Sequence, residues 1–310
     1  SVGQLITFIG LADTIIWPVF ALAGTINLIA RAKASLKRIS TLLDEEIEIK
    51  DLDVITHTNY QGKIEFKHFN FAYPDDPSTL ILKDISLKIN AGETVGIVGK
   101  IGSGKSTLVN MLFRLYNVDE GTLFIDDIDI MHLPIKEIRE NIGYCPQDNF
   151  LFSDTIKNNI AFSNENMSIT EVKEAAKFSS VDDNIEEFKD KYETLIGEKG
   201  VSLSGGQKQR ISISRAIVKD PKILILDDSV SAVDIKTEET ILSNIKNIRK
   251  GKTTLIIASR VSTVQHLDKI LVLRDGQVDA FGTHEECLAK SKIYARMVEL
   301  QLLEKEMEEK

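Results

Sequence analysis

The chain has 310 residues, of which 43% are hydrophobic, and it carries a formal net charge of −9. This length is sufficient for one domain with its own core and a further helix. The acidic balance argues against a general nucleic-acid partner, because binding a phosphate backbone requires a basic surface. The two cysteines, Cys145 and Cys287, are far apart in the sequence, so we expect no disulfide bond and a reducing compartment.

The first 30 residues predict a transmembrane helix. Residues 5–30 contain a single charged residue, Asp13, and are long enough to cross a hydrocarbon core of about 30 Å. Four basic residues follow at once and place that end on the cytoplasmic side: Arg31, Lys33, Lys37 and Arg38. A buried helix of a soluble protein is the alternative, because Gly10, Pro18 and Gly24 interrupt the span.

Asp13 is costly inside a membrane unless it faces a partner or a cavity. It is therefore either a substrate contact or a residue near the outer interface, and the sequence favours neither. Residues 31–59 predict a connector that is amphipathic as far as Asp51. The single span and the lack of an initiator methionine predict a piece of a longer membrane protein.

Residues 99–106 read Gly-Lys-Ile-Gly-Ser-Gly-Lys-Ser, a complete Walker A phosphate loop. An apolar run at 94–98 and helical spacing at 107–113 supply the strand and the helix that this motif requires. A chance Gly/Ser turn would not have both. The motif predicts that Lys105 binds the β- and γ-phosphates of ATP and that Ser106 binds Mg²⁺. The predicted ATP-binding residues of this loop are Gly99, Lys100, Ile101, Gly102, Ser103, Gly104, Lys105, Ser106 and Thr107.

A second strand carries the predicted acid of this site. Residues 223–226 form an unbroken apolar run, typical of a parallel strand buried on both faces. Asp227 follows at its carboxyl end, where a phosphate-loop enzyme places the aspartate that coordinates Mg²⁺. An acidic residue at the end of a strand is often only a solvated turn residue. The phosphate loop in the same chain is what favours Mg²⁺ coordination by Asp227.

Residues 203–207 read Leu-Ser-Gly-Gly-Gln and open a helix that continues through Arg210. A helix start with glycines suits an anion. With the phosphate loop and Asp227, this motif makes residues 60–290 resemble the nucleotide-binding domain of an ATP-binding cassette (ABC) transporter. The resemblance implies an α/β fold with a RecA-like parallel sheet, an antiparallel β layer, a helical subdomain at about 148–220 and a C-terminal helix at 291–310.

The same resemblance assigns roles to further residues. The signature Leu203, Ser204, Gly205, Gly206 and Gln207 would face the γ-phosphate of ATP held by an opposing subunit, although Ser204 could also be an ordinary helix cap. Tyr73 would stack on the adenine, with simple packing as the alternative. Gln147 would touch Mg²⁺ and relay the nucleotide state to the membrane domain. The loop that crosses the dimer interface would be Ser231, Ala232, Val233 and Asp234.

Two residues depart from the family pattern. Asp228 stands where the family has the glutamate that acts on the attacking water, and Ser259 stands where it has a histidine that reaches the γ-phosphate. Aspartate is one methylene shorter, and a misplacement of about 1 Å can cost about a hundredfold in rate. Serine cannot become cationic. The predicted catalytic residues Gln147, Asp228 and Ser259 therefore form a slow site, unless the changes are neutral.

The intact signature and the altered site together predict one subunit of a heterodimeric exporter. The partner would be a second, non-identical ABC subunit, and the cargo drugs, lipids or other hydrophobic compounds. Residues 151–160 and 197–200 resemble exporters of the multidrug and lipid-flipping type, which implies a protein of the cell membrane whose ATPase domain lies in the cytoplasm. A homodimeric half-transporter and a non-catalytic regulatory module remain alternatives. A soluble ABC ATPase would carry a long coiled coil or a second cassette, and the sequence has neither.

Overall fold

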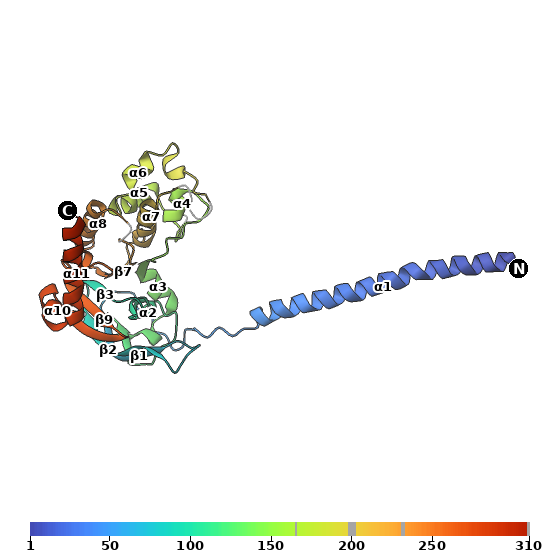
Figure 1. Cartoon of the computed structure of the whole chain (residues 1–310), viewed down its shortest axis with the longest axis horizontal. Coiled ribbons are helices and arrows are strands. Elements are labelled where there is room, and N and C mark those ends of the chain that lie inside the picture. The colour runs from blue at the N-terminus through green and yellow to red at the C-terminus, as the bar shows by residue number, and fades with distance from the viewer. Residues whose placement is uncertain (165, 198–202, 231–232, 309–310) are drawn as a thin grey trace. The chain divides into compact units, whose positions relative to one another are not determined.

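The computed structural model describes residues 1–164, 166–197, 203–230 and 233–308 of the chain (Figure 1). It separates into two units, residues 1–50 and residues 51–310. The residues between these described ranges include Ser231 and Ala232, and most of the predicted exporter segment at 197–200.

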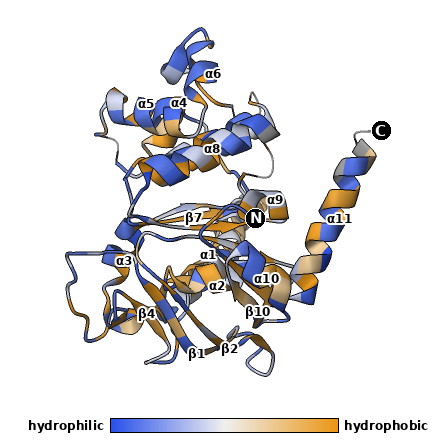
Figure 2. Cartoon of the chain, turned by 90° about the vertical axis from the view of Figure 1, so that its left-hand side faces the viewer, coloured by the Kyte–Doolittle hydropathy of each residue, from blue (hydrophilic) through white to orange (hydrophobic). Residues whose placement is uncertain are grey.

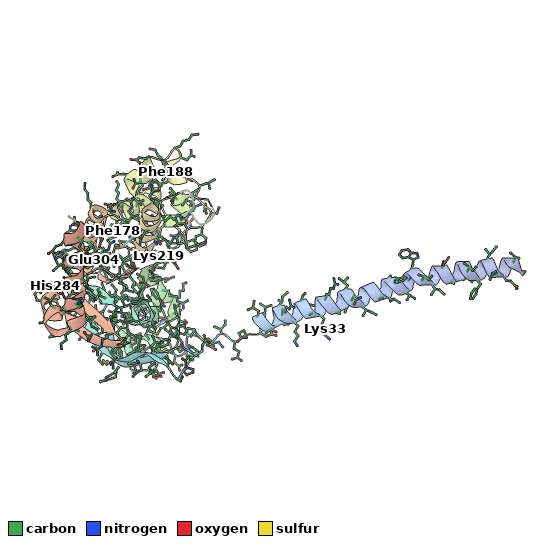
Figure 3. All side chains as sticks on the ribbon, in the orientation of Figure 1. Lys33, Phe178, Phe188, Lys219, His284 and Glu304 are labelled. Carbon is green, nitrogen blue, oxygen red and sulfur yellow. The ribbon has the colours of Figure 1, made fainter. Side chains whose placement is uncertain are left out.

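The first unit consists mainly of one helix, α1 (Val2–Leu43), which buries none of its residues. Its side chains project on all sides (Figure 3). Among the described residues, α1 is the one helix that is long and apolar enough to cross a membrane. It runs without a break past Ala30, because residues 31–43 contain neither proline nor glycine. The first part of the predicted connector is therefore helical.

Two sheets build the second unit. The first is antiparallel with the order β2-β1-β4-β5; its strands are β1 (Ile64–Ala72), β2 (Leu80–Ile89), β4 (Leu123–Ile125) and β5 (Ile128–Asp129). The second has the order β10-β9-β3-β8-β7-β6; its strands are β3 (Thr94–Gly99), β6 (Ile142–Cys145), β7 (Ile223–Asp227), β8 (Thr253–Ile257), β9 (Lys269–Arg274) and β10 (Gln277–Gly282). Its neighbours are parallel except for β10, which pairs antiparallel with β9. The predicted parallel core and antiparallel layer are confirmed.

The helices fall into three groups along the chain. The first group is α2 (Lys105–Met111), η1 (Ile130–His132) and α3 (Ile135–Asn141). The second is the helix-rich segment α4 (Ile156–Ile160), α5 (Ile169–Phe178), α6 (Asp182–Glu186), η2 (Lys191–Glu193) and α7 (Gly205–Ile217). The third is α8 (Ile235–Ile248), α9 (Val261–Val264), α10 (His284–Lys290) and α11 (Lys292–Glu308).

The six-stranded sheet separates two hydrophobic cores, and β7 shows how. Ile223 and Ile225 face the core that includes α2. Figure 2 shows α2 between β7 and the strands β1 and β2. Leu224 and Leu226 face the core built from the helix-rich segment. Because side chains alternate along a strand, an unbroken apolar run is what a strand buried on both faces needs. This explains the sequence pattern and fixes where β7 delivers its last residue, Asp227.

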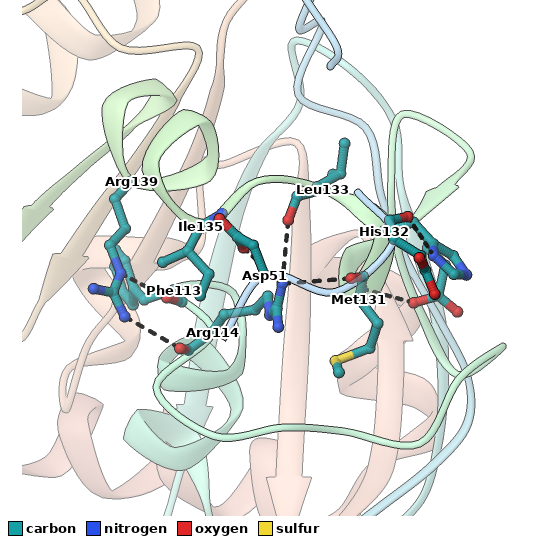
Figure 4. A network of polar contacts seen from close by, with 10 residues as sticks. Asp51, Phe113, Arg114, Met131, His132, Leu133, Ile135 and Arg139 are labelled. Atoms are coloured by element: carbon teal, nitrogen blue, oxygen red, sulfur yellow. Dashed lines mark hydrogen bonds and ion pairs between the residues drawn. The ribbon is translucent and has the colours of Figure 1, made fainter. Parts of the chain in front are cut away.

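The second unit begins at Asp51, which is held by Arg114 (Figure 4). Arg114 follows α2 and is only 1% exposed. Its guanidinium Nη1 donates to the Leu133 carbonyl at 3.2 Å, to the Met131 carbonyl at 3.4 Å and to Asp51 Oδ1 at 3.4 Å. Asp51 Oδ1 also accepts a hydrogen bond from the Ile135 backbone at 3.0 Å. Residues 51–59, predicted as the end of the connector, are thus folded onto this unit.

Candidate functional site

The predicted site residues gather at one edge of the six-stranded sheet. Strands β3, β8, β7 and β6 are parallel neighbours in that order, so their carboxyl ends meet at the same edge. The phosphate loop follows β3, Ser259 follows β8, Asp227 ends β7 with Asp228 directly after it, and Gln147 follows β6. The edge of an open parallel sheet outside its carboxyl ends is where such folds bind ligands.

The phosphate loop has the backbone that its glycines predict. Gly99 has a φ of 155°, and a Cβ there would lie 2.4 Å from the Leu273 carbonyl oxygen. Gly104 begins α2 at a φ of 96°. Gly102 has a φ of 79° with no atom within 4 Å of an added Cβ, and the buried Ser103 hydroxyl has no hydrogen-bond partner among the described residues. An open loop with an unpaired buried hydroxyl fits the phosphate oxygens of a nucleotide.

Lys105 is folded into this loop. Its Nζ donates to the carbonyl oxygens of Gly99 at 2.9 Å and Lys100 at 3.0 Å. Burial lowers the pKa of Lys105, while the charges of Asp227 and Asp228 act in the opposite direction. The ammonium group is therefore positioned inside the loop by main-chain acceptors, with two carboxylates nearby.

Asp227 is buried, with 4% of its surface exposed. Burial raises the pKa of Asp227, and hydrogen bonds from Ser106 and Tyr144 counteract the shift; the Tyr144 hydroxyl donates to Asp227 Oδ2 at 3.4 Å. Gln147 is exposed in the loop after β6. No group of three His, Cys, Asp or Glu side chains suited to a metal exists in the described ranges. A Mg²⁺ ion held by Ser106, Asp227 and Gln147 would complete its shell with water and phosphate oxygens.

The two residues that depart from the family pattern contact each other. The Ser259 hydroxyl donates to Asp228 Oδ1 at 3.3 Å. Asp228 adopts a φ of 46°, which aspartate tolerates better than most residues. Its N–H donates to the Ile257 carbonyl at 2.9 Å, and its carbonyl accepts from Gln209 Nε2 of α7 at 3.3 Å. Asp228 is thus fixed by β8 on one side and by the helix of the Leu-Ser-Gly-Gly-Gln motif on the other.

This motif forms the start of α7, as predicted. Ser204 is the N-cap: its hydroxyl accepts from the Gln207 N–H at 3.2 Å, and Gln207 Oε1 accepts from the Ser204 N–H at 3.0 Å. Leu203 is buried in the helical core. A Cβ at Gly205 would meet no atom within 4 Å, so none of the residues that the structure describes requires glycine there. Ser204 is therefore a true helix cap, and Gly205 leaves open space at the helix start.

Comparisons with known proteins agree with this geometry. A family model described as ABC transporter matches residues 82–231. A solved structure of a bacterial Atm1-family ABC exporter with ATP bound matches with a TM-score of 0.82 at 38% identity, over 88% of this chain and 48% of that one. The chain carries the nucleotide-binding domain of an ABC transporter.

Relatives of this ABC domain include membrane transporters by name. The probable multidrug resistance ABC transporter ATP-binding/permease protein YheI of Bacillus subtilis (strain 168) is 43% identical over 303 residues, which cover 98% of this chain and 52% of YheI. ATP-binding cassette sub-family B member 5 of Mus musculus is 44% identical over 245 residues, which cover 79% of this chain and 20% of that protein. The chain spans about half the length of the bacterial relative.

Tyr73, predicted to stack on the adenine, lies beside the phosphate-loop helix of the ABC domain. Its hydroxyl is 2.9 Å from the Thr107 hydroxyl oxygen. Its ring makes edge contacts with Phe71 and Tyr116 at centroid distances of 5.2 and 5.5 Å. The sequence assigned no role to Tyr116 or Tyr144, and the only signal for Tyr144 is that it lies three residues before Gln147. The stacking role of Tyr73 stays a prediction.

The predicted dimer-interface loop of the ABC domain is described only in its second half. Ser231 and Ala232 lie outside the described residues, and Val233 is buried. Asp234 caps α8 by accepting hydrogen bonds from the Thr237 N–H at 3.0 Å and the Thr237 hydroxyl at 2.7 Å. These hydrogen bonds lower the pKa of Asp234. Within this chain its carboxylate acts as a helix cap.

Ser204→Ala is expected to lower the free energy of unfolding by about 1 kcal/mol, because the first turn of α7 loses its cap. Ser204→Gly should cost only a few tenths of a kcal/mol, since glycine is a fair N-cap itself. Urea unfolding followed by circular dichroism measures both, with Ser168→Ala, the cap of α5, as the matched variant. Equal losses for alanine and glycine at position 204 would contradict the capping role.

Proposed function

We propose that the chain is the ATP-binding part of an ABC exporter subunit whose own ATP site hydrolyses slowly. It would bind Mg-ATP through its phosphate loop and supply its signature to the catalytic site of a second, non-identical ABC subunit. The names of its relatives, such as the probable multidrug resistance transporter YheI, support export as the activity. Drugs, lipids or other hydrophobic compounds are the proposed cargo.

The contact between Asp228 and Ser259 carries this proposal. A residue that acts on the attacking water must reach past the end of β7 toward the phosphate loop. Asp228 is one methylene shorter than glutamate, and its Oδ1 already accepts the Ser259 hydroxyl. Ser259 in turn has only one proton to donate, and that proton is directed at Asp228. Both side chains are therefore engaged with each other rather than free for the hydrolytic step.

The binding of Mg-ATP does not depend on the contact between Asp228 and Ser259. Lys105 would contact the β- and γ-phosphates. Ser106 and Asp227 would hold Mg²⁺ together with Gln147, which lies in the loop after β6. Bound Mg-ATP supplies the phosphoanhydride whose cleavage drives transport. Lys105 already has its charge inside the loop, and Asp227 is held by Tyr144. The chain's groups thus favour retention of the nucleotide over its turnover.

The geometry of the signature, residues 203–207, is suited to binding ATP that is held by a partner subunit. Ser204 and Gln207 order the first turn of α7, which leaves N–H groups of that turn directed outward, and Gly205 keeps the approach open. A helix start of this kind favours an anion. We therefore assign residues 203–207 to the ATP of the partner subunit, with the loop at 231–234 beside it. Helix α1 would lie in the cell membrane, as part of a multi-pass domain, and the ABC domain in the cytoplasm.

The test compares the steady-state ATPase activity of the chain with that of an Asp228→Glu, Ser259→His double variant. Two copies of the chain would provide an intact signature at both sites, so the double variant should hydrolyse ATP about a hundredfold faster. Asp84→Glu, which lengthens an exposed carboxylate of β2, is the control and should change nothing.

Each alternative gives a different result in this assay. A native chain that hydrolyses as fast as the double variant would be an ordinary homodimeric half-transporter. If both bind ATP and neither turns it over, the chain is a non-catalytic regulatory module.

A further inference from the structure

The C-terminal helix reaches the loop that carries Ser259. Gln301 of α11 places its Oε1 2.8 Å from the Val261 N–H and 3.1 Å from the Ser262 N–H, and accepts a hydrogen bond from each. These two N–H groups open α9, which follows Ser259 almost directly. Its N-cap, Arg260, makes no side-chain capping bond. The amide oxygen of a residue far along the chain therefore replaces the missing local cap.

Packing directs Gln301 to this point. Tyr294 is fully buried in a smaller hydrophobic core, distinct from the two that β7 separates, which includes Ala258 and Val261. Met297 and Val298 pack against the same core. Positions 294, 297, 298 and 301 follow helical spacing and lie on one face of α11. A leucine at 301 would continue this apolar stripe, so packing alone gives no reason for a glutamine. The two backbone N–H groups do give one, since unpaired they would be costly.

A second side chain, from a helix that precedes the loop in the chain, also holds this loop. Glu238 of α8 is buried, accepts a hydrogen bond from the Thr263 hydroxyl at 2.5 Å and pairs with Arg260 at 3.8 Å. The segment 258–264 is thus tied to α8 and to α11 by side chains. Ser259 is exposed near the start of this segment and keeps its hydrogen bond to Asp228 only if the segment stays in place.

We propose that Gln301 is a positioning residue of the ATP site and that α11 is a working part of it. Gln301 holds the 258–262 loop so that Ser259 faces Asp228 and the terminal phosphate of the nucleotide. This inference rests on the proposed function in one respect, the placement of the Asp228–Ser259 pair beside the terminal phosphate of the nucleotide. It gives the C-terminal helix a role that the sequence left open, since its charged end at 304–310 reads as a solvated surface.

The experiment uses two variants of the full chain in detergent. Gln301→Leu keeps the size and loses the acceptor, whereas Gln301→Glu keeps an acceptor for both N–H groups. Without nucleotide, hydrogen exchange at the amides of residues 261 and 262 should be about tenfold faster in Gln301→Leu. This is the effect expected when these amides lose a hydrogen-bond acceptor of ordinary strength. Gln301→Glu should exchange like the unaltered chain. Glu304→Leu, on the exposed part of α11, is the control.

A second readout separates positioning from simple stability. The ratio of the dissociation constants for Mg-ADP and Mg-ATP should fall by about threefold or more in Gln301→Leu and recover in Gln301→Glu, since only Mg-ATP has the terminal phosphate that would lie beside the Asp228–Ser259 pair. Unchanged exchange in Gln301→Leu would overturn the inference. Faster exchange with an unchanged ratio would also overturn it, because Gln301 would then be structural only. Failure of the unaltered chain to bind Mg-ATP would overturn the proposed function and the nucleotide role of Gln301 with it, whereas the exchange result would stand apart.

Discussion

Lys105→Ala is expected to lower the affinity of the chain for Mg-ATP by at least about a hundredfold. A hydrogen bond from a charged donor to a charged acceptor contributes about 1.5–3 kcal/mol, and a factor of ten corresponds to about 1.4 kcal/mol. Lys105 would make such bonds to two phosphate groups at once. Equilibrium binding of a fluorescent ATP analogue, competed by ATP, measures the loss.

The local geometry explains why this loss should be large. The Lys105 ammonium is held by the Gly99 and Lys100 carbonyls, so little side-chain freedom is lost when phosphate binds. Lys136→Ala removes an exposed lysine of α3, 85% exposed at its side chain, and should leave binding unchanged. Equal affinities for Lys105→Ala and Lys136→Ala would mean that the loop does not bind phosphate in the way its sequence indicates.

The framework of this site was predictable because its signals are local. The phosphate loop, the apolar run at 223–226 and the signature each occupy consecutive residues, and each dictates its own strand, turn or helix start. Parallel pairing then brings the ends of β3 and β7 to one edge without further information. The strand predicted at 94–98 and the helix start at Gly205 are confirmed.

The contacts that tune the site were not predictable, because they join distant residues. Asp228 and Ser259 were each recognised as departures, yet their hydrogen bond depends on β7 and β8 being neighbours. Gln301 lies 40 residues from Val261, and no pattern in α11 announces an acceptor for that loop. A side chain that hydrogen-bonds to main-chain groups far away in the sequence produces no periodic pattern that could be recognised.

Arg114 shows the same limit, and it carries the largest expected effect on stability. Arg114→Leu should lower the free energy of unfolding of the second unit by about 3 kcal/mol or more, because each main-chain carbonyl that loses its buried donor costs about 1–3 kcal/mol. The substitution leaves the Met131 and Leu133 carbonyls without their guanidinium donor and Asp51 without its cation.

Arg296→Leu is the matched control, because Arg296 pairs with Glu299 on the surface of α11 with 60% of its side chain exposed. Its loss should change stability by less than about 0.5 kcal/mol. Urea unfolding in a fixed detergent concentration, followed by circular dichroism, compares the two. A small effect at Arg114 would mean that its hydrogen bonds to Asp51, Met131 and Leu133 contribute little to the stability of the second unit. A large one would show that Arg114 stabilises the second unit through its contacts with Asp51, Met131 and Leu133.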